Sequence, residues 1–145
     1  MTSGPDGPVP ELASLRRRFI SLIYETLILA AVILAGALPI VMLTRDWDHT
    51  AARILLQAWL VILCGCFYVW QWAGQGQTLP MKTWRMRLMS HDGSTVTRNR
   101  AVVRFGAAML TVATLGLGFL WALADRERQF LHDRLAGTRL VMAHR

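Results

Sequence analysis

The stretch FISLIYETLILAAVILAGALPIVML, residues 19–43, decides how the rest of the chain is interpreted. It holds 25 residues and one charged side chain, Glu25. A helix over residues 19–38 would be about 30 Å long, which matches the hydrocarbon core of a bilayer. A helix that is apolar on every face is unusual in a soluble domain of this size. Three arginines at residues 16–18 precede the stretch, where an anionic cytoplasmic leaflet would hold them. The stretch is therefore predicted to span a membrane.

The overall composition supports a membrane protein. The 145 residues are 54% hydrophobic, with a mean hydropathy of +0.35, which is high for a water-soluble domain. The net charge of +7 would suit nucleic acid, but the basic residues lie at the ends of apolar runs, so no nucleic-acid partner is expected. A cleaved signal peptide is also not expected, because its apolar region is usually only about 7–15 residues long. Cys64 and Cys66 lie within an apolar run and are interpreted as core or lipid-facing residues.

Two further apolar runs follow, at about residues 54–73 and 101–124. The first has no formal charge, and Tyr68, Trp70 and Trp72 near its end are typical of an aromatic belt at a membrane surface. The second is interrupted by two glycines in the sequence LGLGF. It is therefore either one tilted span or a re-entrant pair of short helices, which is tolerated where protein covers the broken backbone.

The predicted fold class is an all-α integral membrane protein with two certain transmembrane helices, a third membrane segment and a small β element at the cytoplasmic surface. One membrane domain, residues 15–143, follows a Gly- and Pro-rich lead-in at residues 1–14 that is predicted to be disordered. Its polar parts are a surface loop at residues 74–100 and a tail at residues 125–145. Pro39 is expected to end or kink the first helix, because it lacks an amide proton.

The polar loop and the tail both carry a strand pattern. Residues 83–89 alternate between apolar side chains and arginines, and residues 138–143 alternate in a similar way. Residues 95–97 could form a short returning strand after an Asp-Gly turn. A small sheet that joins the loop to the tail is predicted. Asp48 or Thr50 is expected to cap the second helix.

The distribution of the 16 Lys and Arg residues predicts an orientation. Three lie in the N-terminal segment, two in the first loop, six at residues 82–104 and five after residue 124. Three full crossings would place the basic tail outside, against the positive-inside rule. A re-entrant third segment would place the tail inside, where it could pair with the strand of the loop. Both termini are therefore predicted to be cytoplasmic.

Four short motifs, in this order and spacing, resemble the RDD family of small bacterial membrane proteins. The matching residues are Arg18, Glu25, Gly76, Gln77, Thr78, Lys82, Arg104, His132, Asp133, Gly137 and Thr138. The resemblance covers roughly residues 15–142, and the sequence GLGFLWAL looks like the proteobacterial branch. Glu25 replaces the usual aspartate and Pro80 replaces a glycine. The resemblance implies a multi-pass protein of the bacterial inner membrane and suggests transport of unidentified ligands or ions.

The candidate site is a network of four charged residues: Arg18, Glu25, Arg104 and Asp133. Glu25 is its strongest member, because an acid about two turns into a membrane helix costs several kcal/mol unless it is paired, protonated or hydrated. Arg18 lies about 10 Å from Glu25 along the helix, so Arg104 is expected to be the more natural partner of Glu25. Two interpretations stay open: a structural bridge from Glu25 to Arg104, or a carboxylate that exchanges a proton or cation.

Asp133 is expected to cap a turn through Thr138 or Gly137, with a salt bridge to Arg85 or Arg87 as the less favoured alternative. Anionic lipid headgroups, at about 1 kcal/mol per contact, are expected at five basic residues: Lys82, Arg85, Arg87, Arg98 and Arg100.

No catalytic residue, metal site or cofactor is predicted. A His132–Asp133 dyad has no nucleophile, and neighbours in sequence cannot easily orient one another. The four histidines show no metal-ligand spacing.

The sequence thus leaves two functions in competition. One is a transport-related protein in which Glu25 exchanges a proton or cation. The other is a non-transporting scaffold or accessory protein whose buried charges are structural. Three membrane segments are too few to enclose a path, so the expected partners, besides the lipid bilayer, are further copies of the chain or another membrane protein.

Overall fold

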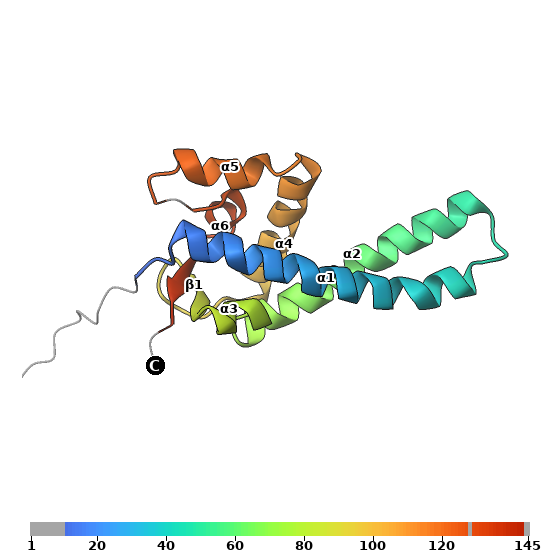
Figure 1. Cartoon of the computed structure of the whole chain (residues 1–145), viewed down its shortest axis with the longest axis horizontal. Helices are drawn as coiled ribbons and strands as arrows, with labels where there is room; N and C mark the ends of the chain where they lie inside the picture. Colours follow the sequence, from blue (N-terminus) through green and yellow to red (C-terminus); the bar gives the residue numbers. More distant parts are fainter. Residues whose placement is uncertain (1–10, 128, 144–145) are drawn as a thin grey trace, which may run out of the picture.

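Two long helices form a hairpin that extends away from the rest of the molecule (Figure 1). A computed structural model describes residues 11–127 and 129–143 of the chain. The first helix, α1 (Leu15–Leu43), has 29 residues, and the second, α2 (His49–Gly74), has 26. Both are long and apolar enough to cross a membrane, which confirms the two predicted spans.

The two helices of the hairpin pack closely at Gly36, and Asp48 caps the start of α2. The carbonyl of Gly36 accepts a 2.9 Å hydrogen bond from the Trp59 indole, and a Cβ atom on Gly36 would overlap the Leu63 side chain. Asp48 caps α2 as predicted, because its carboxylate accepts from the amides of the first turn. Pro39 does not end the first helix, which continues to Leu43.

A two-stranded antiparallel sheet joins the polar loop to the tail. After the short helix α3 (Leu79–Thr83), strand β1 (Met86–Ser90) pairs with β2 (Thr138–Met142), and Leu88 lies opposite Leu140. Met86, Leu88 and Ser90 are buried while Arg87 is exposed, so the predicted alternation is confirmed.

The predicted returning strand at residues 95–97 is wrong. Its last residue, Thr97, instead caps helix α4 (Arg98–Ala113), since its hydroxyl accepts from the amide of Arg100. A threonine followed by a helical apolar pattern forms a cap more readily than a three-residue strand.

The third apolar run is not one continuous helix but two helices that meet near the glycines. Helix α4 is followed by α5 (Leu117–Ala124) at an angle of 102°. The turn between them places Leu115 at φ 54° and Gly116 at φ 85°. Gly118 then packs so closely on Thr111 that a Cβ atom there would collide with it. The chain continues through the short helix α6 (Leu131–Leu135) into β2.

The pairing of β1 with β2 brings together the two ends of the segment that contains α4 and α5. Hydrogen-bonded strands with open edges lie on one side of a bilayer, because hydrocarbon does not tolerate unpaired backbone groups. Strand β1 precedes α4 and β2 follows α5, so the bent pair begins and ends at the same sheet. This arrangement favours a re-entrant segment, the alternative in which the tail can reach the loop, whereas length and composition alone allow a broken span as well.

The N-terminal residues join the same sheet. Leu12 forms a bridge with Val141, and the Ala13 amide donates to the Leu140 carbonyl at 3.0 Å. Most of the predicted lead-in, residues 1–10, lies outside the described residues, but residues 11–14 are ordered against β2. The start of α1, the loop and the tail therefore all meet at one end of the hairpin (Figure 1).

The core lies at this sheet end. It contains the buried side chains of Met86, Leu88 and Leu140 together with Trp72 from α2. The predicted aromatic belt is wrong for Trp72, which is only 5% exposed, whereas Trp70 is 74% exposed and does face outward. Hydrophobic side chains on a helix next to a sheet gain more by entering the core than by lying at an interface.

The arrangement predicts which segments share a side of the membrane. In a chain with Cys64→Ala and Cys66→Ala, single cysteines at Asp92 and Glu127 should react with an impermeant maleimide from one side, and a cysteine at Asp46 only from the other. All three should react after detergent permeabilisation. Labelling of positions 92 and 127 from opposite sides would contradict the re-entrant geometry.

Candidate functional site

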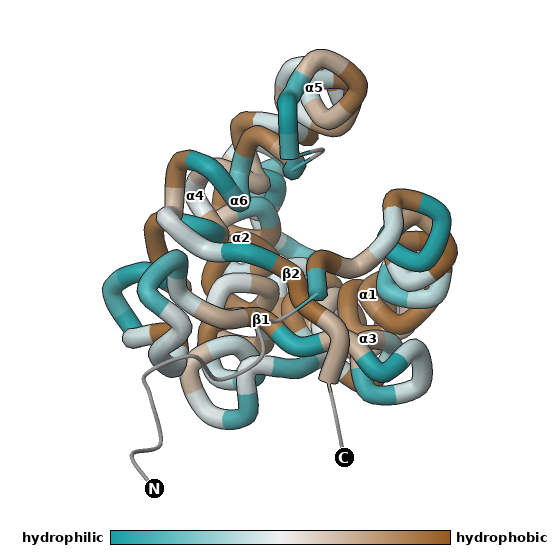
Figure 2. The backbone as a smooth tube through the Cα atoms, turned by 90° about the vertical axis from the view of Figure 1, so that its left-hand side faces the viewer, coloured by the Kyte–Doolittle hydropathy of each residue, from teal (hydrophilic) through white to brown (hydrophobic). Residues whose placement is uncertain are grey.

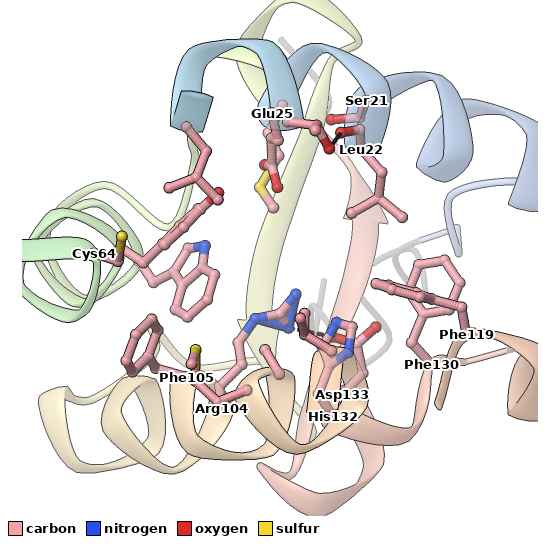
Figure 3. Close-up of a pocket in the computed structure, with 18 of the residues that line it drawn as sticks. Ser21, Leu22, Glu25, Cys64, Arg104, Phe105, Phe119, Phe130, His132 and Asp133 are labelled. Atoms are coloured by element: carbon pink, nitrogen blue, oxygen red, sulfur yellow. Dashed lines mark hydrogen bonds and ion pairs between the residues drawn. The ribbon is translucent and has the colours of Figure 1, made fainter. Parts of the chain in front are cut away.

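A cavity of about 390 Å³ lies between α1, α2 and α4, and its walls differ in character. Most of the lining is apolar and comes from the three helices. The polar part of the lining includes Arg18, Ser21, Glu25, Arg104, His132 and Asp133. Figure 3 shows Glu25 and Ser21 on the α1 side and Arg104, His132 and Asp133 on the opposite side. The sequence-predicted charge network therefore shares one cavity.

Arg104 and Asp133 form a buried ion pair. The Arg104 Nη1 donates to the Asp133 carboxylate, and the two side chains are 5% and 1% exposed. Arg104 also stacks 4.7 Å above the centroid of Trp72 and donates weakly to the Thr138 hydroxyl at 3.4 Å. The pair joins α4 to α6, and its contacts extend to α2 and β2.

The expected partners of Asp133 are corrected by this pair. Its carboxylate does not cap the turn and does not reach Arg85 or Arg87, since its partner is Arg104. The Thr138 hydroxyl donates instead to the backbone carbonyl of Asp133, at 3.4 Å. A buried carboxylate gains more from a guanidinium in the same core than from exposed arginines on a strand.

Arg18 connects the start of α1 to the sheet. It is 2% exposed, and its guanidinium donates to the Ala13 carbonyl at 2.8 Å and to the Leu140 carbonyl at 3.3 Å. A guanidinium carries five N–H donors, so carbonyl oxygens are suitable partners for a buried one. Arg18 thus holds β2 against the first helix.

Glu25 has a different kind of partner from the other three charges. Its Oε1 accepts a 2.5 Å hydrogen bond from the Thr78 hydroxyl, which lies at the start of α3. The predicted bridge from Glu25 to Arg104 is wrong, because Arg104 is turned towards Asp133. Within residues 11–127 and 129–143, no basic side chain lies within 4.0 Å of the Glu25 carboxylate.

His132 lies beside the ion pair among aromatic rings. It stacks on Phe130 at 5.5 Å and meets Phe119 edge to face at 5.8 Å, and its Nε2 is 3.8 Å from the Asp133 carboxylate. Burial lowers the pKa of His132 from its ordinary 6.5 to about 4, although Asp133 acts in the opposite direction. The imidazole is therefore neutral near pH 7.

The glycine-rich motif positions Thr78 for its contact with Glu25. Gly76 adopts φ 64°, and a Cβ atom there would lie 2.8 Å from the Leu88 carbonyl, so glycine is required. Gln77 donates to the Met86 carbonyl at 2.8 Å. Pro80, the departure from the family pattern, is accommodated because it occupies the first turn of α3, where no amide proton is needed.

The remaining motif residues lie away from the cavity or at its margin. Lys82 is exposed at the end of α3, and Gly137 adopts φ 62° in the turn before β2. Among the five basic residues predicted to bind headgroups, four are exposed and Arg100 is partly buried with a 3.6 Å contact to Asp92. Their binding of lipid stays a prediction.

Sequence reasoning missed three contributors to the site. Thr78 was recognised only as part of a motif, Trp72 was placed at the membrane surface, and Ser21 was not considered. Ser21 precedes Glu25 by one helical turn, and this spacing on one helix face was a usable signal. The roles of Thr78 and Trp72 depend on contacts between segments far apart in sequence, so no local pattern indicated them.

The part of the chain that the structure describes holds no group of three or more His, Cys, Asp or Glu side chains placed to bind a metal ion.

Comparison with known proteins gives one finding on the family. The family model described as "RDD family" matches residues 12–137, which is most of the chain. No curated protein and no solved structure matches the chain.

The buried ion pair predicts a large effect of one substitution on stability. Asp133→Asn leaves Arg104 buried without its counter-charge, so the free energy of unfolding should fall by about 3–5 kcal/mol. Denaturant titration in detergent, followed by tryptophan fluorescence, measures this change. Asp46→Asn is the control: it removes an exposed carboxylate 3.6 Å from Arg45, and its effect should stay below about 1 kcal/mol. Equal stability of the two variants would contradict the structural role of Asp133.

The environment of His132 predicts a pH dependence of stability. Its pKa is lowered to about 4 in the folded protein, so the unfolded chain binds the proton more readily and stability falls as pH decreases from about 6.5 to 4. The expected loss is about 3 kcal/mol. His132→Phe keeps an aromatic ring beside Phe130 and should flatten this part of the profile. An unchanged profile in the variant would assign the pH dependence to another group.

Proposed function

The chain belongs to the RDD family of membrane proteins, and from this premise we propose that it is a transport-related protein in which Glu25 exchanges a proton or a cation. The observation that supports this most is the position of the Glu25 carboxylate. It lies at a cavity between membrane helices, with a hydroxyl as its hydrogen-bond partner and no basic group within 4.0 Å among the described residues.

The other three charges serve the fold in this proposal. Arg104 and Asp133 neutralise each other, and Arg18 donates to backbone carbonyls of the sheet. Buried charges that are matched in this way hold helices in place, whereas an acid in a membrane helix without a basic partner indicates a site for protons or ions. The proposal therefore assigns exchange to Glu25 and structural roles to the remaining members of the network.

The orientation that we propose places both termini in the cytoplasm of a bacterial cell, with the protein in the inner membrane. The basic N-terminal segment and loop then lie inside, as the positive-inside rule requires. We also propose that several copies, or a partner membrane protein, assemble around the hairpin. Among the described residues α1 and α2 are long enough to cross, or three spans exist if the bent pair of α4 and α5 counts as one, and so few helices do not enclose a path.

A second function is favoured by a separate observation, the buried pair of Arg104 and Asp133. A scaffold or accessory protein would also need an ion pair that holds its helices together, and in that case Glu25 would stabilise the fold as well. The two functions predict opposite results for the flux and folded yield of a Glu25 variant.

Glu25→Gln separates them. In proteoliposomes loaded with a pH-sensitive dye, a Na⁺ or K⁺ gradient should change the internal pH with the unaltered protein. The variant should reduce this rate at least about tenfold, because an amide neither releases a proton nor balances a cation. Its folded yield should stay normal, since the amide oxygen still accepts from Thr78.

Asp46→Asn, which neutralises an exposed carboxylate, is the control and should leave the flux unchanged. Flux that survives Glu25→Gln would refute the exchange role. A loss of folded Glu25→Gln protein, with no flux from the unaltered protein, would favour the scaffold.

A further inference from the structure

We propose that the cavity binds an amphipathic organic cation, with the charged group at Glu25 and the apolar body between α1, α2 and α4. This inference rests on the proposed function and names the class of substrate that the same site would take.

The polar end of the cavity offers hydrogen-bonding atoms that the described chain does not use. Five buried side chains that line the cavity each have a nitrogen or oxygen atom without a hydrogen-bond partner in that part of the chain: Ser21, Trp72, Arg104, His132 and Asp133. Each of the five is at least 95% buried. Buried polar atoms in proteins are nearly always paired, so the cavity has unused hydrogen-bonding capacity. The Trp72 and Arg104 nitrogens can only donate, whereas the Asp133 oxygen is an acceptor and the Ser21 hydroxyl can also accept from a cationic group.

The cavity lining has two acids and two arginines and so carries no net charge, and the case for a cation comes from how these side chains are paired. Arg104 is neutralised by Asp133 and turned onto the Trp72 ring, and Arg18 donates to carbonyls of the N-terminal segment and β2. Glu25 is the acid whose charge no basic group within 4.0 Å balances in the described chain. A positively charged group beside it would offset the cost of the carboxylate in the membrane.

Aromatic rings lie where an organic cation needs them. Tyr68 and Phe105 line the cavity, and their ring centroids are 6.5 Å apart. A cation within about 6 Å of such ring faces gains about 0.5–2 kcal/mol, more when it is desolvated. A bare metal ion would use neither these faces nor the apolar walls.

The apolar part of the cavity accounts for the body of the ligand. Its apolar lining includes Leu29 and Ile33 from α1 and Met109 and Val112 from α4. Its volume of about 390 Å³ falls within the range of sites for small organic molecules. Figure 2, viewed along the hairpin, shows α5 and α4 set apart from α1, and neither packs extensively on α1.

Two probes of matching shape and opposite charge test the proposal. Binding of tetraphenylphosphonium and tetraphenylborate is measured with the protein in nanodiscs of phosphatidylglycerol, and binding to empty nanodiscs is subtracted. The unaltered protein should bind the phosphonium at least tenfold more tightly than the borate. Glu25→Gln should remove this preference.

Adjacent residues on α1 provide a matched pair of variants. Ile33→Trp fills the cavity and should weaken phosphonium binding at least tenfold, whereas Leu34→Trp alters a side chain that is 67% exposed and should not. Equal binding of the two probes, or no effect of either Glu25→Gln or Ile33→Trp, would overturn the proposal.

The outcomes distinguish this inference from the proposed function. Flux that depends on Glu25 without phosphonium binding would refute the organic cation alone, and phosphonium binding without any flux would refute transport alone. Repeating the measurement with phosphatidylethanolamine in the nanodiscs identifies the source of the cation. Competition would assign the site to the ammonium group of a lipid, and unchanged binding to a diffusible cation, and both results support the proposed chemistry.

Discussion

The structure depends on the pairing of two buried guanidinium groups with partners that arrive late in the sequence. Arg104 on α4 pairs with Asp133 on α6, and Arg18 on α1 donates to the Leu140 carbonyl on β2. An isolated charge in a medium of low dielectric costs several kcal/mol, so each arginine requires its partner to be in place. These two requirements determine where the tail lies, and the sheet then joins the tail to the strand that precedes the bent pair.

Glu25 is connected to the same structure through a single hydroxyl. Thr78 caps α3 and donates to the Glu25 carboxylate, and α3 leads directly into β1. A change in the charge or ligand of Glu25 would therefore alter the contact with Thr78 at the start of α3, which is directly followed by the sheet. This places Glu25 at a junction between the membrane helices and the polar end of the protein.

Much of this fold could be predicted from the sequence because it depends on local patterns. The two spans follow from uninterrupted apolar runs, the break near Gly116 from glycines, and the sheet from alternation at Met86 and Leu88. The four charges of the candidate network were also identified, because a charge within an apolar run is conspicuous.

Their pairing could not be predicted, because it depends on where α6 and β2 fold back. From the sequence alone, either Glu25 or Asp133 could pair with Arg104, and their distances along the chain do not decide between the two acids. The position of Trp72 also depends on such contacts: its sequence pattern is that of a membrane-surface residue, but it lies in the core against Tyr68 and Arg104.

The position of β2 near the end of the chain has a consequence for biosynthesis. Helices enter the bilayer in the order in which the ribosome makes them, so Arg18 and Arg104 are delivered before Leu140 and Asp133 exist. During that interval the nascent protein holds two cationic helices that lack their final partners.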